Sequence, residues 1–190
     1  CLAVRPSAWA TCASKPGLKA AKALARRLSA TAPATVVFLR DGMTQPLALS
    51  GNIIALPAAL LELADGPDAI AGYVLAEQQR AATTNPTRAL LHHAGLPATV
   101  QLLASGALSP DAMQGYGEIL LAQTPAPLTD QALLAAFEQA GVSSGPYAYE
   151  VDKSGESTLG LIEADPLPGG SKPAVLDDAG WLELQAICSE

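Results

Sequence analysis

The feature that most limits how this chain folds is a central helix pattern that carries two charged residues on or near its apolar face. Residues 67–80 begin with Pro67, which suits the first turn of a helix, and apolar side chains such as Val74 then recur at helical spacing. Glu77 and Arg80 lie one turn apart, on or near the face expected to be buried. A buried polar pair is costly unless its hydrogen bonds are satisfied. We therefore expect this pair to have a specific structural or functional role.

Composition indicates a single domain with a hydrophobic core and argues against a nucleic-acid-binding or membrane-spanning protein. The chain has 190 residues, enough for one domain with a proper core. Hydrophobic residues make up 49% and aromatic residues 4%, so the core must consist mainly of Ala, Leu, Val and Ile in closely packed helices. The net charge of -7 argues against a nucleic-acid surface, because phosphate binding needs clustered Lys and Arg. No apolar run reaches the roughly 18 to 20 residues of a membrane span.

Local patterns predict an α+β fold, with helices around a small, mostly antiparallel sheet. Residues 16–30 form an amphipathic helix pattern, 35–39 read as a strand, and 45–49 with 53–56 read as a hairpin. The cations of the first helix are expected to form a solvated face: Lys19, Lys22, Arg26 and Arg27. Further helices are predicted over 57–63, 86–94, 109–122, 129–140 and 177–188, and a second hairpin over 147–151 and 158–162.

The three cysteines lie near the two ends of the chain, at Cys1, Cys12 and Cys188. An odd count allows three single-bridge pairings and leaves one thiol over. A bridge from the amino-terminal segment to Cys188 would join both ends and suit an exported protein. Three unpaired cysteines are the alternative. We expect a periplasmic or otherwise exported location, with the cytoplasm as the alternative, and Cys1 is a candidate lipidated residue.

Two segments resemble the HtpX/BepA-type, CAAX-prenyl-protease-like zinc metallopeptidases. The active-site helix of that family usually reads close to PDELAGVLAHELGH. Here the lead-in is Pro67-Asp68-Ala69-Ile70-Ala71-Gly72, and Ala76-Glu77-Gln78-Gln79-Arg80 stands where the family has His-Glu-x-x-His. Residues 45–54, Gln-Pro-Leu-Ala-Leu-Ser-Gly-Asn-Ile-Ile, are similar to the family's NAFALPGG segment upstream of that helix. The resemblance covers roughly residues 16–145.

The resemblance implies a gluzincin fold, zincin-like, with one peptidase-like domain over residues 1–190. Its core would span 16–145, and 146–190 would add the second hairpin, a Pro/Gly linker and a docking helix. The family's third zinc ligand is the Glu of a Glu-x-x-x-Asp motif, in which Asp130 is kept and the Glu position is Ala126.

The three former metal-ligand positions are therefore Ala76, Arg80 and Ala126. Catalytic zinc needs about three protein ligands and a bound water, and neither alanine nor arginine supplies a donor. We expect zinc to be lost, no other cofactor, and Glu77 to be a vestigial catalytic residue with no metal-bound water to deprotonate.

The same resemblance suggests what replaces the metal and where a ligand lies. We expect Arg80 to lie between Glu77 and Asp130 as a charge cluster, provided good geometry offsets the desolvation. Ordinary exposed positions for Glu77 and Arg80 are the alternative. The family's hairpin implies that an extended peptide pairs with one strand edge: Ile53, Ile54, Ala55 and Leu56.

Three functions follow from this reading. The first is a catalytically inactive pseudo-peptidase that binds a peptide or protein partner. The second is a zinc metallopeptidase with non-standard ligands, and the third is a structural or assembly domain. Gly141-Val142-Ser143-Ser144-Gly145 matches the serine-hydrolase pattern by letters, but it follows a helix instead of joining a strand to a helix. We expect no serine nucleophile there, and the oligomeric state stays open.

Overall fold

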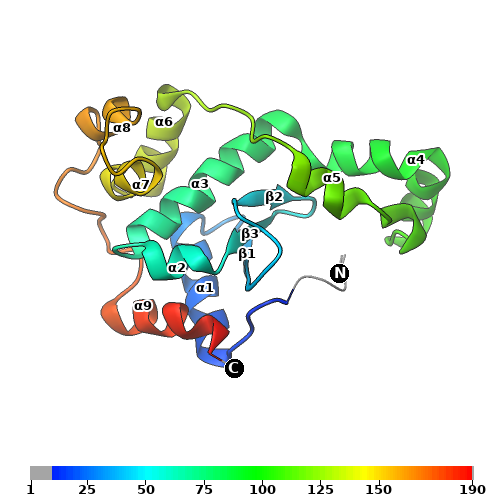
Figure 1. The fold of residues 1–190 in the computed structure, drawn as a ribbon, viewed down its shortest axis with the longest axis horizontal. Helices are drawn as coiled ribbons and strands as arrows, with labels where there is room; N and C mark the ends of the chain where they lie inside the picture. The colour runs from blue at the N-terminus through cyan, green and yellow to red at the C-terminus, as the bar shows by residue number, and fades with distance from the viewer. Residues whose placement is uncertain (1–9, 190) are drawn as a thin grey trace.

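The computed structural model describes residues 10–189, and its fold is α+β as predicted (Figure 1). Helices surround a small sheet, and a helical arm, residues 86–122, extends to one side. In chain order the elements are α1 Lys15–Leu28, β1 Thr35–Leu39, β2 Leu47–Leu49, β3 Ile53–Pro57, α2 Ala59–Leu63, α3 Pro67–Thr84, α4 Pro86–Ser105, the 3-10 helix η1 Asp111–Met113, α5 Tyr116–Ala122, α6 Asp130–Ala140, α7 Gly145–Val151, α8 Leu159–Glu163, α9 Asp178–Gln185 and the 3-10 helix η2 Ala186–Cys188.

The three-stranded sheet has the order β1-β3-β2, so β3 is its central strand. β2 pairs with β3 antiparallel, which confirms the predicted hairpin, while β1 pairs with β3 parallel. The sheet is therefore mixed, and not mostly antiparallel as predicted. The predicted peptide-binding edge at Ile53, Ile54, Ala55 and Leu56 is therefore wrong, because both sides of β3 are already hydrogen-bonded. Sequence order alone does not reveal that β1 takes the second side.

Helix α3 crosses the middle of the molecule and is buried on several sides through its first turns (Figure 1). Proline at its first turn and Asp68 begin it, and Asn85 ends it in the left-handed conformation at φ 49°. Four of its eight buried residues are alanine or glycine, and α6, α7 and the sheet all approach closely. At Gly72 the Cβ and ring of Tyr147 take the space where a side chain would be. The sequence predicted that one face of this helix is buried, whereas its first turns are buried on several sides.

The two ends of the described chain are joined. Cys12 and Cys188 form a disulfide, which confirms a bridge between the amino-terminal segment and the last helix. Helix α1 packs along α9 and η2, and Gly17 lies directly against Ile187. Cys1 lies outside the described residues.

The predicted second hairpin is wrong, since residues 147–151 and 158–162 lie largely in helices α7 and α8. The turn between them is built by Asp152, whose carboxylate accepts hydrogen bonds from the N–H and hydroxyl groups of Ser154 and Ser157. These bonds hold the pKa of Asp152 well below its usual range. Both segments are short, largely apolar runs of five residues, and periodicity alone does not distinguish a strand from a helix over so short a run.

Arg27 is not part of a solvated face, as the sequence suggested, but joins three segments. Its guanidinium donates to the carbonyl oxygens of Ala140 (2.6 Å), Gly141 (2.9 Å) and Pro173 (2.7 Å). Two of these carbonyls lie at the end of α6, where the helix dipole favours a cation.

We expect Arg27→Met to lower the free energy of unfolding by about 1.5 kcal/mol, because charge-assisted hydrogen bonds are lost while solvent partly replaces them. Arg26→Met, at the exposed neighbouring position, is the matched control and should change it by less than about 0.5 kcal/mol. Urea denaturation measures both, and equal effects for the two variants would contradict the role of Arg27.

Candidate functional site: a pocket beside Glu77 and Arg80

A pocket of about 140 Å³ opens between the sheet, α3 and the base of the arm. Its wall combines apolar side chains with a single carboxylate and a single guanidinium. The lining residues are Gln45, Pro46, Leu47, Ala48, Glu77, Arg80, Thr84, Pro86, Ala89, Tyr116, Leu120, Gln123, Thr124, Pro125 and Ala126.

Glu77 lies on the third turn of α3 and is only 3% exposed. One carboxylate oxygen pairs with Arg80 Nη1, and the other accepts the Ala48 N–H at 3.1 Å. Burial raises the pKa of Glu77, and the Arg80 charge and these hydrogen bonds act in the opposite direction without cancelling that effect. The expectation of ordinary exposed positions for the pair is therefore wrong for Glu77.

Arg80 connects α3 to the segment that joins α5 and α6. Besides its ion pair with Glu77, it donates from Nε to the carbonyl oxygen of Ala126 at 3.0 Å. Its side chain is 23% exposed. Arg80 also interacts with Tyr147 of α7, where burial raises the pKa of the phenol and the Arg80 charge lowers it by a smaller amount. These contacts fix the guanidinium in one orientation.

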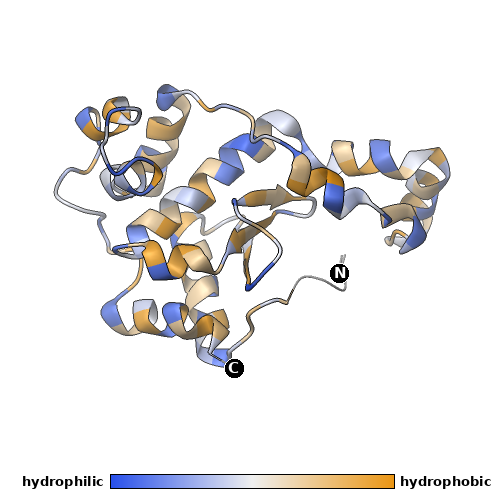
Figure 2. Cartoon of the chain, in the orientation of Figure 1, coloured by the Kyte–Doolittle hydropathy of each residue, from blue (hydrophilic) through white to orange (hydrophobic). Residues whose placement is uncertain are grey.

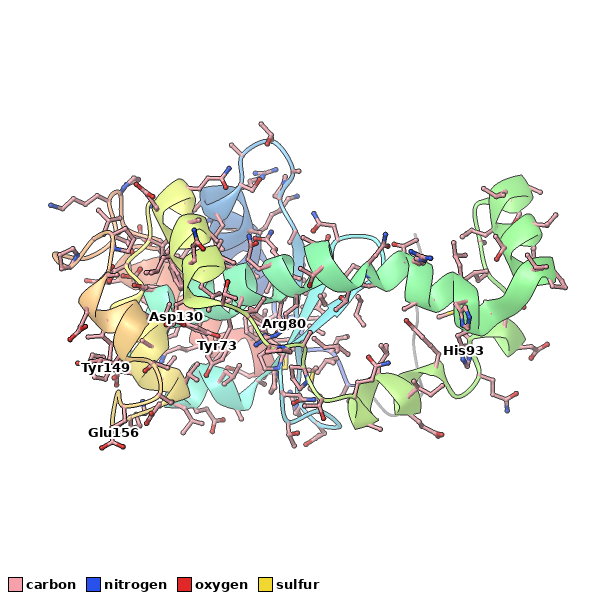
Figure 3. The ribbon with its side chains drawn as sticks, turned by 90° about the horizontal axis from the view of Figure 1, so that it is seen from above. Tyr73, Arg80, His93, Asp130, Tyr149 and Glu156 are labelled. Carbon is pink, nitrogen blue, oxygen red and sulfur yellow. A yellow bond between two sulfur atoms is a disulfide. The ribbon has the colours of Figure 1, made fainter. Side chains whose placement is uncertain are left out.

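Asp130 does not join this cluster, so the predicted guanidinium between two carboxylates is wrong. Asp130 is exposed at the start of α6, and its carboxylate lies where a side chain on Gly160 of α8 would be. Figure 3 shows it apart from Arg80. Among the described residues, Arg80 forms its ion pair with Glu77. Asp130 is the first residue of α6, and its carboxylate lies against α8, a contact that the sequence motif did not indicate.

The three positions that the peptidase resemblance assigns to former zinc ligands are only partly brought together. Arg80 and the backbone of Ala126 meet at the pocket, whereas Ala76 is fully buried in the core and does not line it. These residues do not fit zinc, because two methyl groups and a guanidinium offer no lone pair. Within residues 10–189, no three His, Cys, Asp or Glu side chains are close enough to hold a metal ion.

The structure also identifies site residues that the sequence reading missed. Tyr147 contacts the Arg80 side of the site from α7, and Tyr116 and Leu120 form one wall from α5. No local signal identifies them, because their part in the site depends on how α5 and α7 pack. Periodicity did indicate that Leu120 lies in a helix.

The serine motif serves the fold. Ser143 Oγ donates to Asp165 Oδ2 at 2.6 Å, and Ser144 Oγ donates to the carbonyl oxygen of Leu161 at 2.6 Å. Burial acts to raise the pKa of Asp165, but hydrogen bonds from Ser143 and from backbone N–H groups hold it below its usual value. The two histidines of the chain, His92 and His93, are adjacent on α4, and His93 Nε2 forms a hydrogen bond with the carbonyl oxygen of Gln114.

No protein-family model matches this chain, and a search of curated proteins found no match. The peptidase resemblance therefore rests on the two quoted segments alone.

The buried carboxylate predicts a pH dependence. Because folding raises the pKa of Glu77, the folded state binds its proton more tightly than the unfolded chain does. The contribution of Glu77 to stability is thus fully present below its unfolded pKa, near 4.3, and is lost as the pH rises through the folded pKa.

We expect Glu77→Gln to remove the loss of stability that Glu77 causes as the pH rises. The free energy of unfolding of the variant, relative to that of wild type, should therefore increase from pH 4 upward. Urea denaturation across this range measures it. Glu118→Gln, at an exposed position of α5, controls for the loss of one negative charge. A wild-type profile that rises where the Glu77→Gln profile stays level would contradict the raised pKa.

Proposed function

We propose that this protein is a catalytically inactive, metallopeptidase-like scaffold that binds a peptide or protein partner in the pocket beside Glu77 and Arg80. The observation that carries the proposal is the set of hydrogen bonds made by Glu77 and Arg80. Both oxygens of Glu77 are occupied, and Arg80 bonds the backbone of Ala126 at the former ligand position. These bonds hold the carboxylate against Ala48 and Arg80, whereas a general base must lie within hydrogen-bond reach of the water that it activates.

The mode of binding differs from strand addition. The Ala48 N–H on the outer side of β2 already bonds Glu77, so a peptide strand cannot use it. The apolar wall of Leu47, Tyr116 and Leu120 favours insertion of a side chain instead. Because the one cation and the one anion of the lining neutralise each other, an uncharged, apolar side chain is the best match.

We also propose an exported, for example periplasmic, location. The Cys12–Cys188 disulfide supports it, because such bonds persist in oxidising compartments and are rare in the cytosol.

Labelled β-casein, an unfolded protein, is a suitable probe, with binding followed by fluorescence anisotropy and cleavage by gel electrophoresis. We expect binding without cleavage. Ala89→Trp fills the pocket from an exposed position of α4 and should weaken binding at least about tenfold. Ala82→Trp is the matched control, since it adds the same ring at an exposed position of α3 outside the lining.

Each other result has a defined meaning. Cleavage of casein that depends on stoichiometric zinc would overturn the proposal and favour the metallopeptidase with non-standard ligands. Absence of binding, or equal weakening by both tryptophan variants, would also overturn it and favour the structural or assembly domain.

A further inference from the structure

The arm, residues 86–122, has an unusual charge distribution. Residues 89–110 contain no Asp, Glu, Lys or Arg, although the whole chain has 18 acidic and 11 basic side chains. Arg88 and Asp111 mark the two limits of this stretch. The uncharged part therefore coincides with the outer portion of the arm, which Figure 1 shows extending away from the body.

The outer portion carries large apolar side chains that nothing in the described residues covers. Gly95 bends α4 with φ 79°, and the helix continues from there to Ser105. Beyond the bend, Leu96 is 81% exposed, Val100 is 64% exposed and Leu103 is 83% exposed. Their spacing of four and three residues places them on one face of the helix. Figure 2 shows hydrophobic residues continuing to the far end of the arm.

Hydroxyl groups in this part of the helix are bonded internally. Thr99 Oγ1 donates to the carbonyl oxygen of Gly95 at 2.9 Å, and Ser105 Oγ donates to that of Gln101 at 2.7 Å. Because these hydroxyl groups already have partners in the helix, they need fewer hydrogen bonds to water. The free-energy cost of removing this end of the arm from water is therefore smaller than its polar residues suggest.

We propose that the outer face of α4, formed by Leu96, Val100 and Leu103, inserts into the interfacial layer of an uncharged lipid bilayer. A neutral lipid surface fits because its zwitterionic headgroup layer has no net charge, and residues 89–110, which carry this face, contain no Asp, Glu, Lys or Arg. A protein partner fits less well, because a stable interface buries about 800 Å² per side and usually includes a polar, charged rim. Interfacial helices enter only about 5 to 10 Å, which a projecting tip reaches without the body touching the membrane.

The contact is peripheral and weak. In the described residues no helix is long and apolar enough to cross a bilayer. A single myristoyl chain binds to a membrane with a binding constant of about 10⁴ M⁻¹. Because the three side chains of this face bury less hydrocarbon than a myristoyl chain, we expect half-saturation of binding near or above about 1 mM lipid. Since the body carries a net negative charge, binding to anionic lipid should be no stronger.

Co-sedimentation with neutral phosphatidylcholine vesicles tests the proposal. We expect wild type to bind, Leu96→Ser and Leu103→Ser each to lower the partition coefficient about tenfold, and added salt to change it little. Leu182→Ser is the matched control, because Leu182 is 65% exposed on α9, and it should bind like wild type. Ala89→Trp should keep vesicle binding, which separates this proposal from the peptide pocket.

Three results would overturn the proposal. They are no binding to neutral vesicles at 10 mM lipid, an equal loss for Leu182→Ser, and binding that requires anionic lipid. Analytical ultracentrifugation completes the test: self-association that Leu103→Ser abolishes, without vesicle binding, would assign this face to a second copy of the chain.

Discussion

Replacing Gly72 by alanine should lower the free energy of unfolding by about 2 to 3 kcal/mol. An added Cβ would lie 2.6 Å from Cγ and 2.8 Å from Cδ2 of Tyr147, and closer still to its Cβ, so α3 and α7 would have to separate. Overpacking of this kind costs about 1 to 3 kcal/mol and more when the backbone must move. Alanine gains about 1 kcal/mol over glycine in a helix, and the clash outweighs that gain.

Gly169→Ala is the matched control, because no atom lies within 4 Å of its added Cβ. It should leave stability unchanged or raise it slightly. Chemical denaturation of the two variants measures the difference, and far-ultraviolet circular dichroism checks that both fold. A Gly72→Ala variant as stable as wild type would show that α3 and α7 do not pack this closely.

Removal of the Cys12–Cys188 disulfide should lower the free energy of unfolding by about 2 to 5 kcal/mol. The bond closes a loop with a sequence separation of 176 residues, and in the chain-entropy model a long loop gives a large stabilisation. It also holds the start of α1 beside η2, where Gly17 meets Ile187.

The double variant Cys12→Ala, Cys188→Ala tests this prediction in urea. Wild type should lose stability when a reductant is added, whereas the double variant should respond little to it. The same stability for oxidised and reduced wild type would contradict the prediction. Binding of β-casein in the pocket should survive at low urea concentration, because the disulfide lies away from the pocket lining.

Much of the candidate site depends on contacts between distant segments. The sequence led us to expect the pairing of Glu77 with Arg80, because i, i+3 neighbours meet on any helix. It did not indicate Ala48 N–H as the second partner of Glu77, since that contact requires β2 to lie against α3. The motif that led us to Asp130 describes spacing along the chain, and the carboxylate points elsewhere.

What the sequence determined by itself is local: α1, the β2–β3 hairpin, the central helix and α6, all of which have strong periodicity, turn residues or capping residues. Only the tertiary structure decided that β3 is central, that 147–151 and 159–163 are helical, and that Arg27 joins the end of α6 to Pro173. The physical reason is that periodicity and caps act within a few residues. Strand order, helix contacts and the partners of a buried charge are set by the packing of the whole chain.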